Sequence, residues 1–418
     1  MSMQTIPKNR KRSKKTAVII SLAAFSLLVV ITFLIYLTID RQNKQRTFTE
    51  FERRITALTY KDVYLAKDLS EKKISRLSTD LSENKTKMTE KSYKRLSGKL
   101  KQISAKYSKL SEVNALFSSA AISGDEIVSA AIKDNLTQNE VKTVKLTNLD
   151  KSQFTVELSR AVQDADNQLA QIEKVKTEIK NNTASTTVAS DISEIKNTQL
   201  QTSYTTQLRT RDANAVKAKY AGKKIIALTF DDGPSDKTTP KLLDILKQNG
   251  VKATFCELGQ NIQLHQDITK RVAAEGHEII SHSWSHPDLT KLSKEDVQSQ
   301  VEDTSALIKQ VSGQDNPLYR PPYGSTNDAV LSEINRAAFE WDIDTEDWRD
   351  STSEPVVKAA VKAAHDKGVI LMHDIHAWSV DAVPEIIKQL KAQGYTFVTA
   401  SELVQVKYGA IMPHQVYY

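Results

Sequence analysis

The stretch Thr229-Phe-Asp-Asp-Gly-Pro234 decides both the fold and the location of the site. It follows the apolar run 225–228 (Ile-Ile-Ala-Leu), which is typical of a buried parallel strand. Because Gly-Pro ends the strand in a turn, Asp231 and Asp232 are expected at its carboxyl end. Adjacent side chains of an extended chain point in different directions, so the two carboxylates are expected to have different roles. Taken alone, the motif is also compatible with a turn in which Asp only forms hydrogen bonds.

Similar apolar runs recur through the C-terminal half of the chain and alternate with helical patterns. The runs cover residues 225–230, 253–256, 278–281, 318–320, 338–343, 369–372 and 396–399. Helical patterns such as 241–247 and 383–390 lie between most of them. This alternation predicts an α/β fold, with a parallel sheet wrapped by helices. About seven strands over this length favour a barrel over an open sheet.

Two histidines follow the predicted strand at 278–281. His282 and His286 are four residues apart, so both imidazoles fall on one side of a helical turn or tight loop. Two histidines and one carboxylate are a common ligand set for catalytic zinc, and Asp232 is the candidate carboxylate. The histidine pair alone is also compatible with a chance surface pair.

Three further motifs follow: Arg320-Pro-Pro-Tyr-Gly324, Asp344-Thr-Glu-Asp-Trp348 and Leu371-Met-His373. Each has a purely structural alternative, namely a rigid turn, a helix start and a buried core histidine. However, polar residues stand at or just after the ends of five predicted strands: Asp231, His282, Arg320, Asp344 and His373. In a (β/α) barrel that end of the strands carries the active site.

Together the five motifs, in this order, resemble the polysaccharide deacetylase family, also called the NodB-homology domain or carbohydrate esterase family 4. The resemblance covers residues 216–408, about half the chain. It implies a distorted (β/α) barrel with fewer than eight strands. It also implies a metal-dependent hydrolase that removes an N-acetyl group from a sugar, which releases acetate and leaves a free amine.

The resemblance further implies how the first half of the site works. Asp232, His282 and His286 match the family's metal ligands and would bind Zn²⁺, with Co²⁺ or Mn²⁺ as alternatives. Asp231 matches the catalytic base that takes a proton from water. Arg320 would orient this carboxylate and keep it ionised.

The remaining candidates match the acid and the substrate pocket of the family. His373 would be the general acid that protonates the departing amine, and Asp347 would raise its pKa by charge proximity. The backbone N–H of Tyr323 would stabilise the oxyanion. Trp348 and Leu371 would enclose the acetyl methyl group.

Several residues outside the motifs are expected to have no chemical role. Solvated helix or loop positions are expected for His265, His277, His365 and His414. Cys256 falls in a predicted buried strand, where cysteine acts as a small apolar residue. It is the only cysteine in the sequence, so no intramolecular disulfide can form.

The N-terminus has the pattern of a membrane anchor. Residues 1–16 carry six basic residues and no acidic one, and residues 17–39 are 23 uncharged, mainly apolar residues. Such a run is long enough to cross a bilayer, whereas a cleaved signal peptide has a shorter apolar region and a small-residue cleavage site. The positive flank predicts a cytoplasmic N-terminus and an extracellular C-terminal part. A buried core helix is the alternative.

The region between anchor and barrel divides by composition. Residues 40–180 are predicted as a mainly helical extracellular module, with apolar residues at helical spacing: Leu96, Leu100, Ile103, Tyr107, Leu110 and Val113. A spacer and an interaction surface are its two possible roles. Residues 181–212, rich in Asn, Ser, Thr and Ala, are predicted as a linker, and residues 213–418 as the catalytic domain.

Location and family together suggest the substrate. A deacetylase held outside the membrane meets peptidoglycan first, so N-acetylglucosamine of peptidoglycan is the expected target. N-acetylmuramic acid, chitooligosaccharide and O-acetyl-xylan are alternatives with the same chemistry. A non-catalytic cell-surface glycan-binding protein and a membrane sensor are alternatives of other classes. The net charge of +7 is modest, and no nucleic-acid motif is present, so no nucleic-acid partner is expected.

Overall fold

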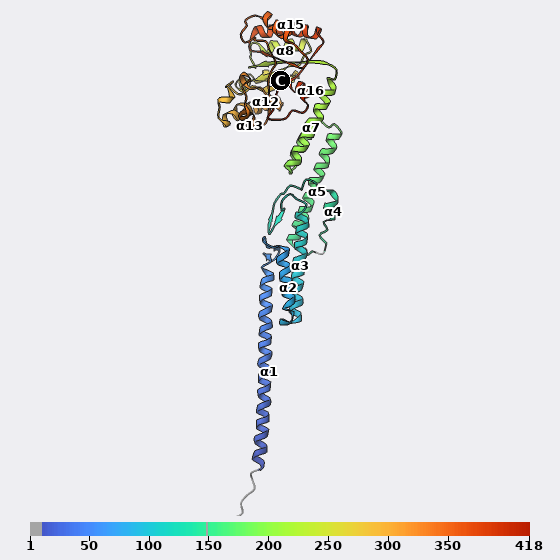
Figure 1. Cartoon of the computed structure of the whole chain (residues 1–418), viewed down its shortest axis with the longest axis vertical. Coiled ribbons are helices and arrows are strands. Elements are labelled where there is room, and N and C mark those ends of the chain that lie inside the picture. The colour runs from blue at the N-terminus through green and yellow to red at the C-terminus, as the bar shows by residue number, and fades with distance from the viewer. Residues whose placement is uncertain (1–10, 148) are drawn as a thin grey trace, which may run out of the picture. The chain divides into compact units, whose positions relative to one another are not determined.

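The computed structural model describes residues 11–147 and 149–418, which form two compact units (Figure 1). The first unit contains the described residues up to 178 together with 190–202, and the second contains 179–189 and 203–418. Each unit is described by itself below.

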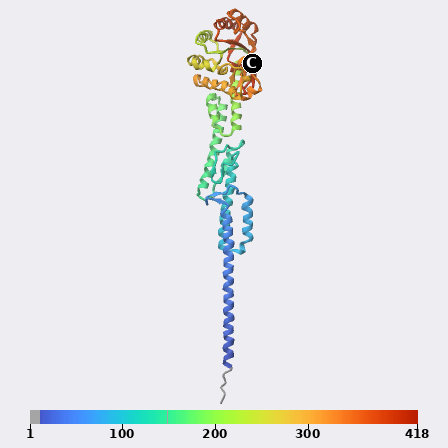
Figure 2. The same cartoon turned by 90° about the vertical axis from the view of Figure 1, so that its left-hand side faces the viewer.

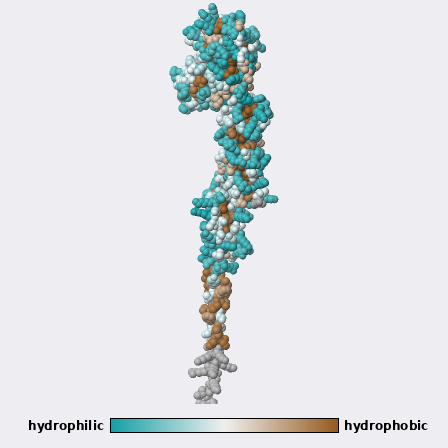
Figure 3. All heavy atoms as spheres, turned by 45° about the vertical axis from the view of Figure 1, so that its right-hand side comes forward, coloured by the Kyte–Doolittle hydropathy of each residue, from teal (hydrophilic) through white to brown (hydrophobic). Residues whose placement is uncertain are grey.

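The first unit begins with the long helix α1 (Lys11–Thr56). Among the described residues, Val18–Thr56 is the one helical segment long and apolar enough to cross a membrane. The large apolar side chains between residues 18 and 39 are exposed, and Figure 3 shows them as a brown segment of the surface. The helix continues well past residue 39, where the predicted anchor ends. Most of the predicted basic tail, residues 1–10, lies outside the described residues.

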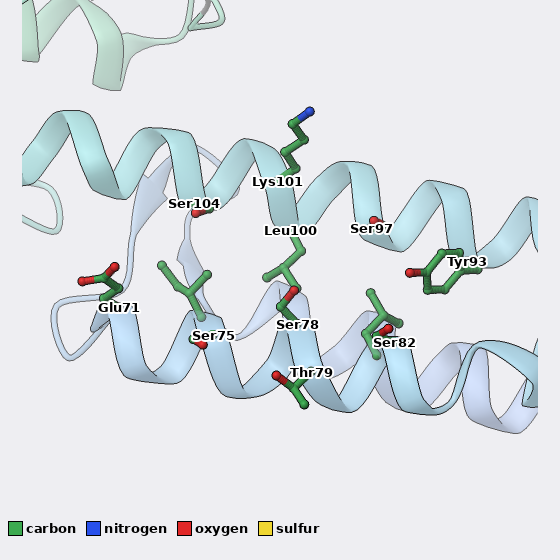
Figure 4. A pocket seen from close by; sticks show the side chains of 12 residues that line it. Glu71, Ser75, Ser78, Thr79, Ser82, Tyr93, Ser97, Leu100, Lys101 and Ser104 are labelled. Atoms are coloured by element: carbon green, nitrogen blue, oxygen red, sulfur yellow. The ribbon is translucent and has the colours of Figure 1, made fainter.

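The rest of this unit is mainly helical, as predicted. Its helices are α2 (Glu71–Glu83), α3 (Glu90–Asn114), α4 (Gln138–Thr143) and α5 (Gln153–Lys180), with the 3₁₀ turn η1 (Lys85–Lys87) between α2 and α3. Ser70 and Thr89 cap the starts of α2 and α3. Two short antiparallel hairpins, β1–β2 (Thr59–Tyr60, Tyr64–Leu65) and β3–β4 (Ile122–Ser123, Glu126–Ile127), interrupt the helices. Serine side chains line a shallow groove between α2 and α3 (Figure 4).

The stretch predicted as a linker contains two helices, α6 (Ser185–Ser193) and α7 (Thr198–Lys219). Their formation differs from the loss of helical pattern expected there. The reason is that few apolar residues form the buried faces of these helices: Val188 and Ile192 in α6, and Tyr204 and Leu208 in α7. Polar residues surround them and hide the spacing. The domain boundary at residue 213 falls inside α7 and stays a prediction.

The second unit is built around a curled, barrel-like sheet in which every strand pairing is parallel. Its strands are β5 (Lys224–Asp231), β6 (Thr254–Glu257), β7 (Glu278–Ser281), β8 (Leu318–Tyr319), β9 (Ala337–Phe339), β10 (Ile343–Asp344), β11 (Gly368–His373), β12 (Tyr395–Val398) and β13 (Val416–Tyr417). The order is β10-β11-β5-β6-β7-β8-β9-β13, and β12 pairs with the first half of β5. The predicted α/β barrel class is therefore confirmed.

The strand count differs from the seven predicted. The predicted run 338–343 is divided into β9 and β10, because its first part pairs with β8 and β13 and its last part pairs with β11 at the other end of the strand order. The two-residue strand β13 is too short to carry a periodic pattern. These two differences account for the sheet of nine strands.

Helices surround this sheet (Figures 1 and 2). They are α8 (Thr239–Gln248), α9 (Gly259–Leu264), α10 (Gln266–Ala274), α11 (Lys294–Gln298), α12 (Thr304–Ser312), α13 (Asp328–Glu333), α14 (Ser353–Ala363), α15 (Ala377–Ala392) and α16 (Ala400–Tyr408). Alternate residues of β5 enter two separate cores: Leu228 packs in one core with Leu242 of α8, and Ala227 in the other with Leu403 of α16. Both faces of β5 are buried, which explains its continuous apolar run.

One histidine outside the motifs is placed differently from the prediction. His277 is buried rather than solvated, and its Nδ1 accepts a hydrogen bond from Ala253 N (3.2 Å). Burial lowers the pKa of His277 to about 4, so the ring is neutral at pH 7. The turn before β7 packs against the start of β6, and this contact is not visible in the sequence. Cys256 is buried in β6, as predicted.

Candidate active site

The polar residues predicted at strand ends meet at one end of the sheet. Asp231 is the last residue of β5 and His373 the last of β11, and these two residues are register partners. His282 directly follows β7, and Arg320 directly follows β8. A cavity of about 400 Å³ opens at this end. All predicted site residues line it except Arg320 and Asp347, which lie behind it; Trp341 and Asp344 also line it.

Asp232, His282 and His286 form a compact cluster in this cavity. One ligand atom from each lies within 4.8 Å of the others. Asp232 Oδ1 is 3.6 Å from His282 Nε2 and 3.6 Å from His286 Nε2. The structure therefore brings the three predicted ligands together around one point.

The chemistry of these three residues fits a divalent cation. Asp232 Oδ1 is buried and has no hydrogen-bond partner among the described residues, although it lies beside two imidazoles. His282 Nδ1 is 2.9 Å from the carbonyl oxygen of Arg320, so it carries the proton and leaves the Nε2 lone pair facing Asp232. Burial, and then the neighbouring His282, lower the pKa of His286, which keeps this ring in the neutral form that metals bind.

Asp231 forms a buried ion pair behind the cluster. Arg320 Nη1 donates to Asp231 Oδ1 (2.7 Å) and to Thr229 Oγ1 (2.8 Å), and Arg320 Nε donates to Phe339 O (3.1 Å). The Arg320 side chain is completely buried, and Asp231 is 2% exposed. Burial raises the pKa of Asp231, but the charge of Arg320 outweighs it and holds the pKa below its usual value. Asp231 is therefore ionised at neutral pH.

Replacing Arg320 with Met is expected to destabilise the second unit by ~3–5 kcal/mol, because the buried Asp231 loses the charge that compensates it. All four tryptophans lie beyond residue 230, so their fluorescence reports unfolding of this unit alone. Arg349→Met is the matched control, since Arg349 pairs with Glu346 at the surface and such pairs contribute ~1 kcal/mol or less. Equal unfolding midpoints for the two variants would contradict the structural role of Arg320.

Position 233 requires glycine because the carboxylate of Asp374 lies directly against it. A Cβ atom at residue 233 would be 2.5 Å from Oδ1 of the fully buried Asp374. Burial raises the pKa of Asp374 to about 7, and Thr239 Oγ1 donates to its other oxygen. The turn that carries Asp231 and Asp232 is thus packed closely on its far side.

His373 and Asp347 form the opposite wall. His373 Nδ1 is 2.8 Å from Asp347 Oδ1, and His373 N donates to Asp347 Oδ2 (2.7 Å). Ser379 Oγ also donates to Asp347 Oδ2 (2.6 Å), and Trp378 Nε1 donates to Asp347 O (2.8 Å). Burial lowers the pKa of His373, but the hydrogen bond to Asp347 and its charge raise it more strongly, to about 9.

Apolar and aromatic side chains complete the cavity. Leu371 is buried, whereas Tyr323 and Trp348 are 67% and 55% exposed. Tyr323 has a left-handed backbone (φ 62°), and its ring lies 4.5 Å from that of His286. Trp341 was not among the predicted site residues. It follows β9 by two residues, and its aromatic character at a strand end is the only sequence signal that marks it.

The fold and the site define a barrel-like α/β protein with a candidate three-ligand metal centre. A model of the polysaccharide deacetylase family matches residues 218–341. The peptidoglycan-N-acetylmuramic acid deacetylase PdaC of Bacillus subtilis is 45% identical over 185 residues, 44% of this chain and 40% of the relative. The peptidoglycan-N-acetylglucosamine deacetylase PgdA of Listeria monocytogenes is 43% identical over 180 residues, 43% of this chain and 39% of the relative.

A peptidoglycan-N-acetylglucosamine deacetylase of Bacillus cereus is 38% identical over 190 residues, which are 44% of this chain and 69% of the relative. The chain therefore belongs to the polysaccharide deacetylase family. Its matched part spans only about 40% of the length of the Bacillus subtilis and Listeria relatives.

Proposed function

We propose that this chain is a metal-dependent hydrolase that removes N-acetyl groups from N-acetylglucosamine in peptidoglycan, giving glucosamine residues and acetate. The observation that carries the proposal is that an ionised Asp231, a three-ligand cluster and a protonated His373 line one cavity at the strand ends. The names of the relatives, which act on N-acetylated sugars of peptidoglycan, support the substrate class.

In the proposed reaction, Asp231 acts as the base, and its neighbours Asp232, His282 and His286 bind the metal ion. A divalent ion held by Asp232, His282 and His286, with Zn²⁺ as the first choice and Co²⁺ or Mn²⁺ as alternatives, supplies Lewis-acid polarisation of the acetyl carbonyl and of water. Asp231 accepts the proton of the attacking water through Oδ2, because Oδ1 is held by Arg320. Arg320 keeps Asp231 ionised and fixes its orientation.

Residues on the other walls of the cavity protonate the leaving group and stabilise the oxyanion. His373 donates its proton to the departing amine, and Asp347 holds the ring in position through Nδ1. The backbone N–H of Tyr323, presented by a left-handed turn, stabilises the oxyanion. Leu371 and Trp348 enclose the acetyl methyl group. The positions of these residues in and beside the cavity support the proposed roles.

Asp347→Asn is expected to move the alkaline limb of the pH–rate profile to lower pH. Deacetylation needs protonated His373, so activity is lost as the pH rises through the pKa of this residue. Without the charge of Asp347, burial lowers that pKa, and the acid loses its proton earlier. The profile of kcat against pH measures the shift, and the rate at neutral pH is expected to fall ~10²-fold or more. An unchanged alkaline limb would exclude His373 as the acid.

The N-terminal part supports a location at the cell membrane. The segment 18–39 of α1 exposes its apolar side chains, and the sequence before it is basic. By the positive-inside rule, the N-terminus is cytoplasmic and the second unit extracellular. The helical module, predicted as residues 40–180, then acts as a spacer between the membrane and the catalytic domain, predicted as residues 213–418.

The direct test is amine release from purified peptidoglycan by the full-length chain in detergent, with and without chelator. Mass analysis of the digested glycan shows whether glucosamine or muramic acid has lost the acetyl group. Acetate release from chitooligosaccharide or acetylated xylan, without release from peptidoglycan, would keep the chemistry and overturn the substrate. Binding to glycans without release of acetate from any of them would favour the glycan-binding alternative.

A further inference from the structure

A four-residue segment, Leu258–Asn261, lies between the two loops that carry the candidate metal ligands. It consists of Leu258, which joins β6 to α9, and the first three residues of α9. On one side, it binds the loop of Asp232: Leu258 N donates to Gly233 O (2.9 Å), and Asn261 Nδ2 donates to Asp232 O (2.8 Å). The second of these bonds comes from the Asn261 side chain and is accepted by the main-chain oxygen of Asp232, which is itself a candidate metal ligand.

On its other side, the same segment binds the loop of the two histidines. Gly259 N donates to Ser283 O (3.1 Å), and Gln260 N donates to Trp284 O (3.1 Å). The first N–H groups of a helix have no partner within it, and here the first turn of α9 uses two of them to hold the loop. The segment therefore ties both ligand loops to one short piece of backbone.

Both loops need such support because their backbones are strained. Asp232 (φ 74°), Ser283 (φ 72°) and His286 (φ 63°) all adopt the left-handed conformation, and none is glycine. Each such residue is energetically costly and persists only where the surrounding structure holds it. Two of the three strained residues are themselves candidate ligands.

A second contact holds the histidine loop from the opposite side. Gln300, in the π-helical turn η3 (Ser299–Asp303) before α12, accepts hydrogen bonds at Oε1 from Trp284 N (2.9 Å) and Ser285 N (3.0 Å). Gly259 completes the packing: a Cβ atom there would overlap the Trp284 ring at Cε3 and lie 2.6 Å from Thr304 Oγ1. The histidine loop is thus confined between α9 and the π-helical turn.

We propose that residues 258–261 set the spacing between the carboxylate ligand and the two imidazole ligands, with Asn261 and Gly259 as positioning residues for the metal site. The inference rests on the metal site of the proposed function and adds residues that do not contact the ion. Residues that orient metal ligands change metal affinity by ~10–100-fold when they are replaced.

The test is titration of Zn²⁺ into the metal-free full-length chain by calorimetry, together with the absorption spectrum of the Co²⁺ form. Asn261→Leu removes the donor to Asp232 at similar size and without a new charge. We expect its Kd for Zn²⁺ to rise ~10–100-fold and its Co²⁺ spectrum to change, because the carboxylate is displaced. Gly259→Ala pushes Trp284 outward and is expected to act in the same direction.

Gln260→Ala is the matched control, since Gln260 is exposed and contributes only its main-chain N–H. Its Kd and spectrum are expected to equal those of the wild type. Tryptophan fluorescence shows whether each variant is folded, and Asn261→Leu keeps the test decisive if Gly259→Ala does not fold. A Kd within twofold of the wild type for folded Asn261→Leu, with an unchanged spectrum, would overturn the inference.

Metal binding needs no substrate, so this test separates the two claims. A wild-type chain that binds Zn²⁺ but deacetylates nothing would contradict the proposed reaction and leave the positioning effect measurable. A wild-type chain that binds no divalent ion would overturn the metal site and the inference together.

Discussion

Asp231→Asn is expected to lower kcat for deacetylation by ~10²–10⁴-fold while the chain still binds its metal ion. The amide keeps the shape of the side chain and an acceptor for Arg320, but it cannot take a proton from water. Metal affinity is expected to persist because Asp231 is not one of the three clustered ligands. Amine release from peptidoglycan measures the rate, and Zn²⁺ calorimetry measures the binding.

The control for this variant is Asp236→Asn, which removes an exposed carboxylate from the same loop. It is expected to leave the rate unchanged. The unfolding midpoint must also be followed, because Asp231→Asn leaves the buried Arg320 charge without its partner and lowers stability. Activity within tenfold of the wild type in a folded, metal-bound Asp231→Asn chain would exclude Asp231 as the base.

The sheet and the placement of the site were predictable because burial leaves a strong sequence pattern. Both faces of β5 are covered, so the strand is a continuous apolar run that ends abruptly at two carboxylates. Parallel strands bring their carboxyl ends together, and this rule places Asp231 at the same end of the sheet as Arg320, 89 positions along the chain. The contact between His373 and Asp347, which lies three residues past β10, was instead an expectation from the family resemblance.

The elements that the sequence did not predict lack such a pattern. Strand β13 has two residues, and α6 has few apolar residues among many polar ones. Burial of His277 depends on a contact between two separate strands. Short elements and isolated contacts are specified by tertiary packing, and the periodicity of the sequence does not reveal which residues pack together.

The same limit applies to the support of the site. Leu258, Gly259 and Gln260 act through main-chain N–H groups, which every non-proline residue has. No residue type marks such a role. Gly259 alone carries a signal, but a lone glycine before a helix is common in proteins that bind no metal. The residues predicted from the sequence therefore lie in the recognisable motifs, and the positioning residues of the segment 258–261 emerged only from the structure.

Removing divalent ions is expected to abolish activity and to lower the stability of the second unit. Asp232 Oδ1 is buried beside two imidazoles without a hydrogen-bond partner among the described residues, so the cluster gains a partner when an ion binds. A ligand at 100 times its Kd stabilises the folded state by ~2.7 kcal/mol. Addition of Zn²⁺ to the chelated chain is expected to restore activity and raise the tryptophan-monitored unfolding midpoint.

His286→Ala tests whether the stabilisation by Zn²⁺ arises from the three-residue cluster, since it removes one of the three ligands. Its midpoint is expected to respond little to Zn²⁺, whereas His265→Ala, which lies outside the motifs, is expected to respond as the wild type does. The lowered pKa of His286 adds a direction: this ring stays in the neutral, metal-binding form to a lower pH than an ordinary histidine, and its own contribution to binding is lost as pH falls through that lowered pKa. An equal rise of the midpoint in His286→Ala would mean that Zn²⁺ binds elsewhere, and the cluster at the strand ends would then not be the metal site.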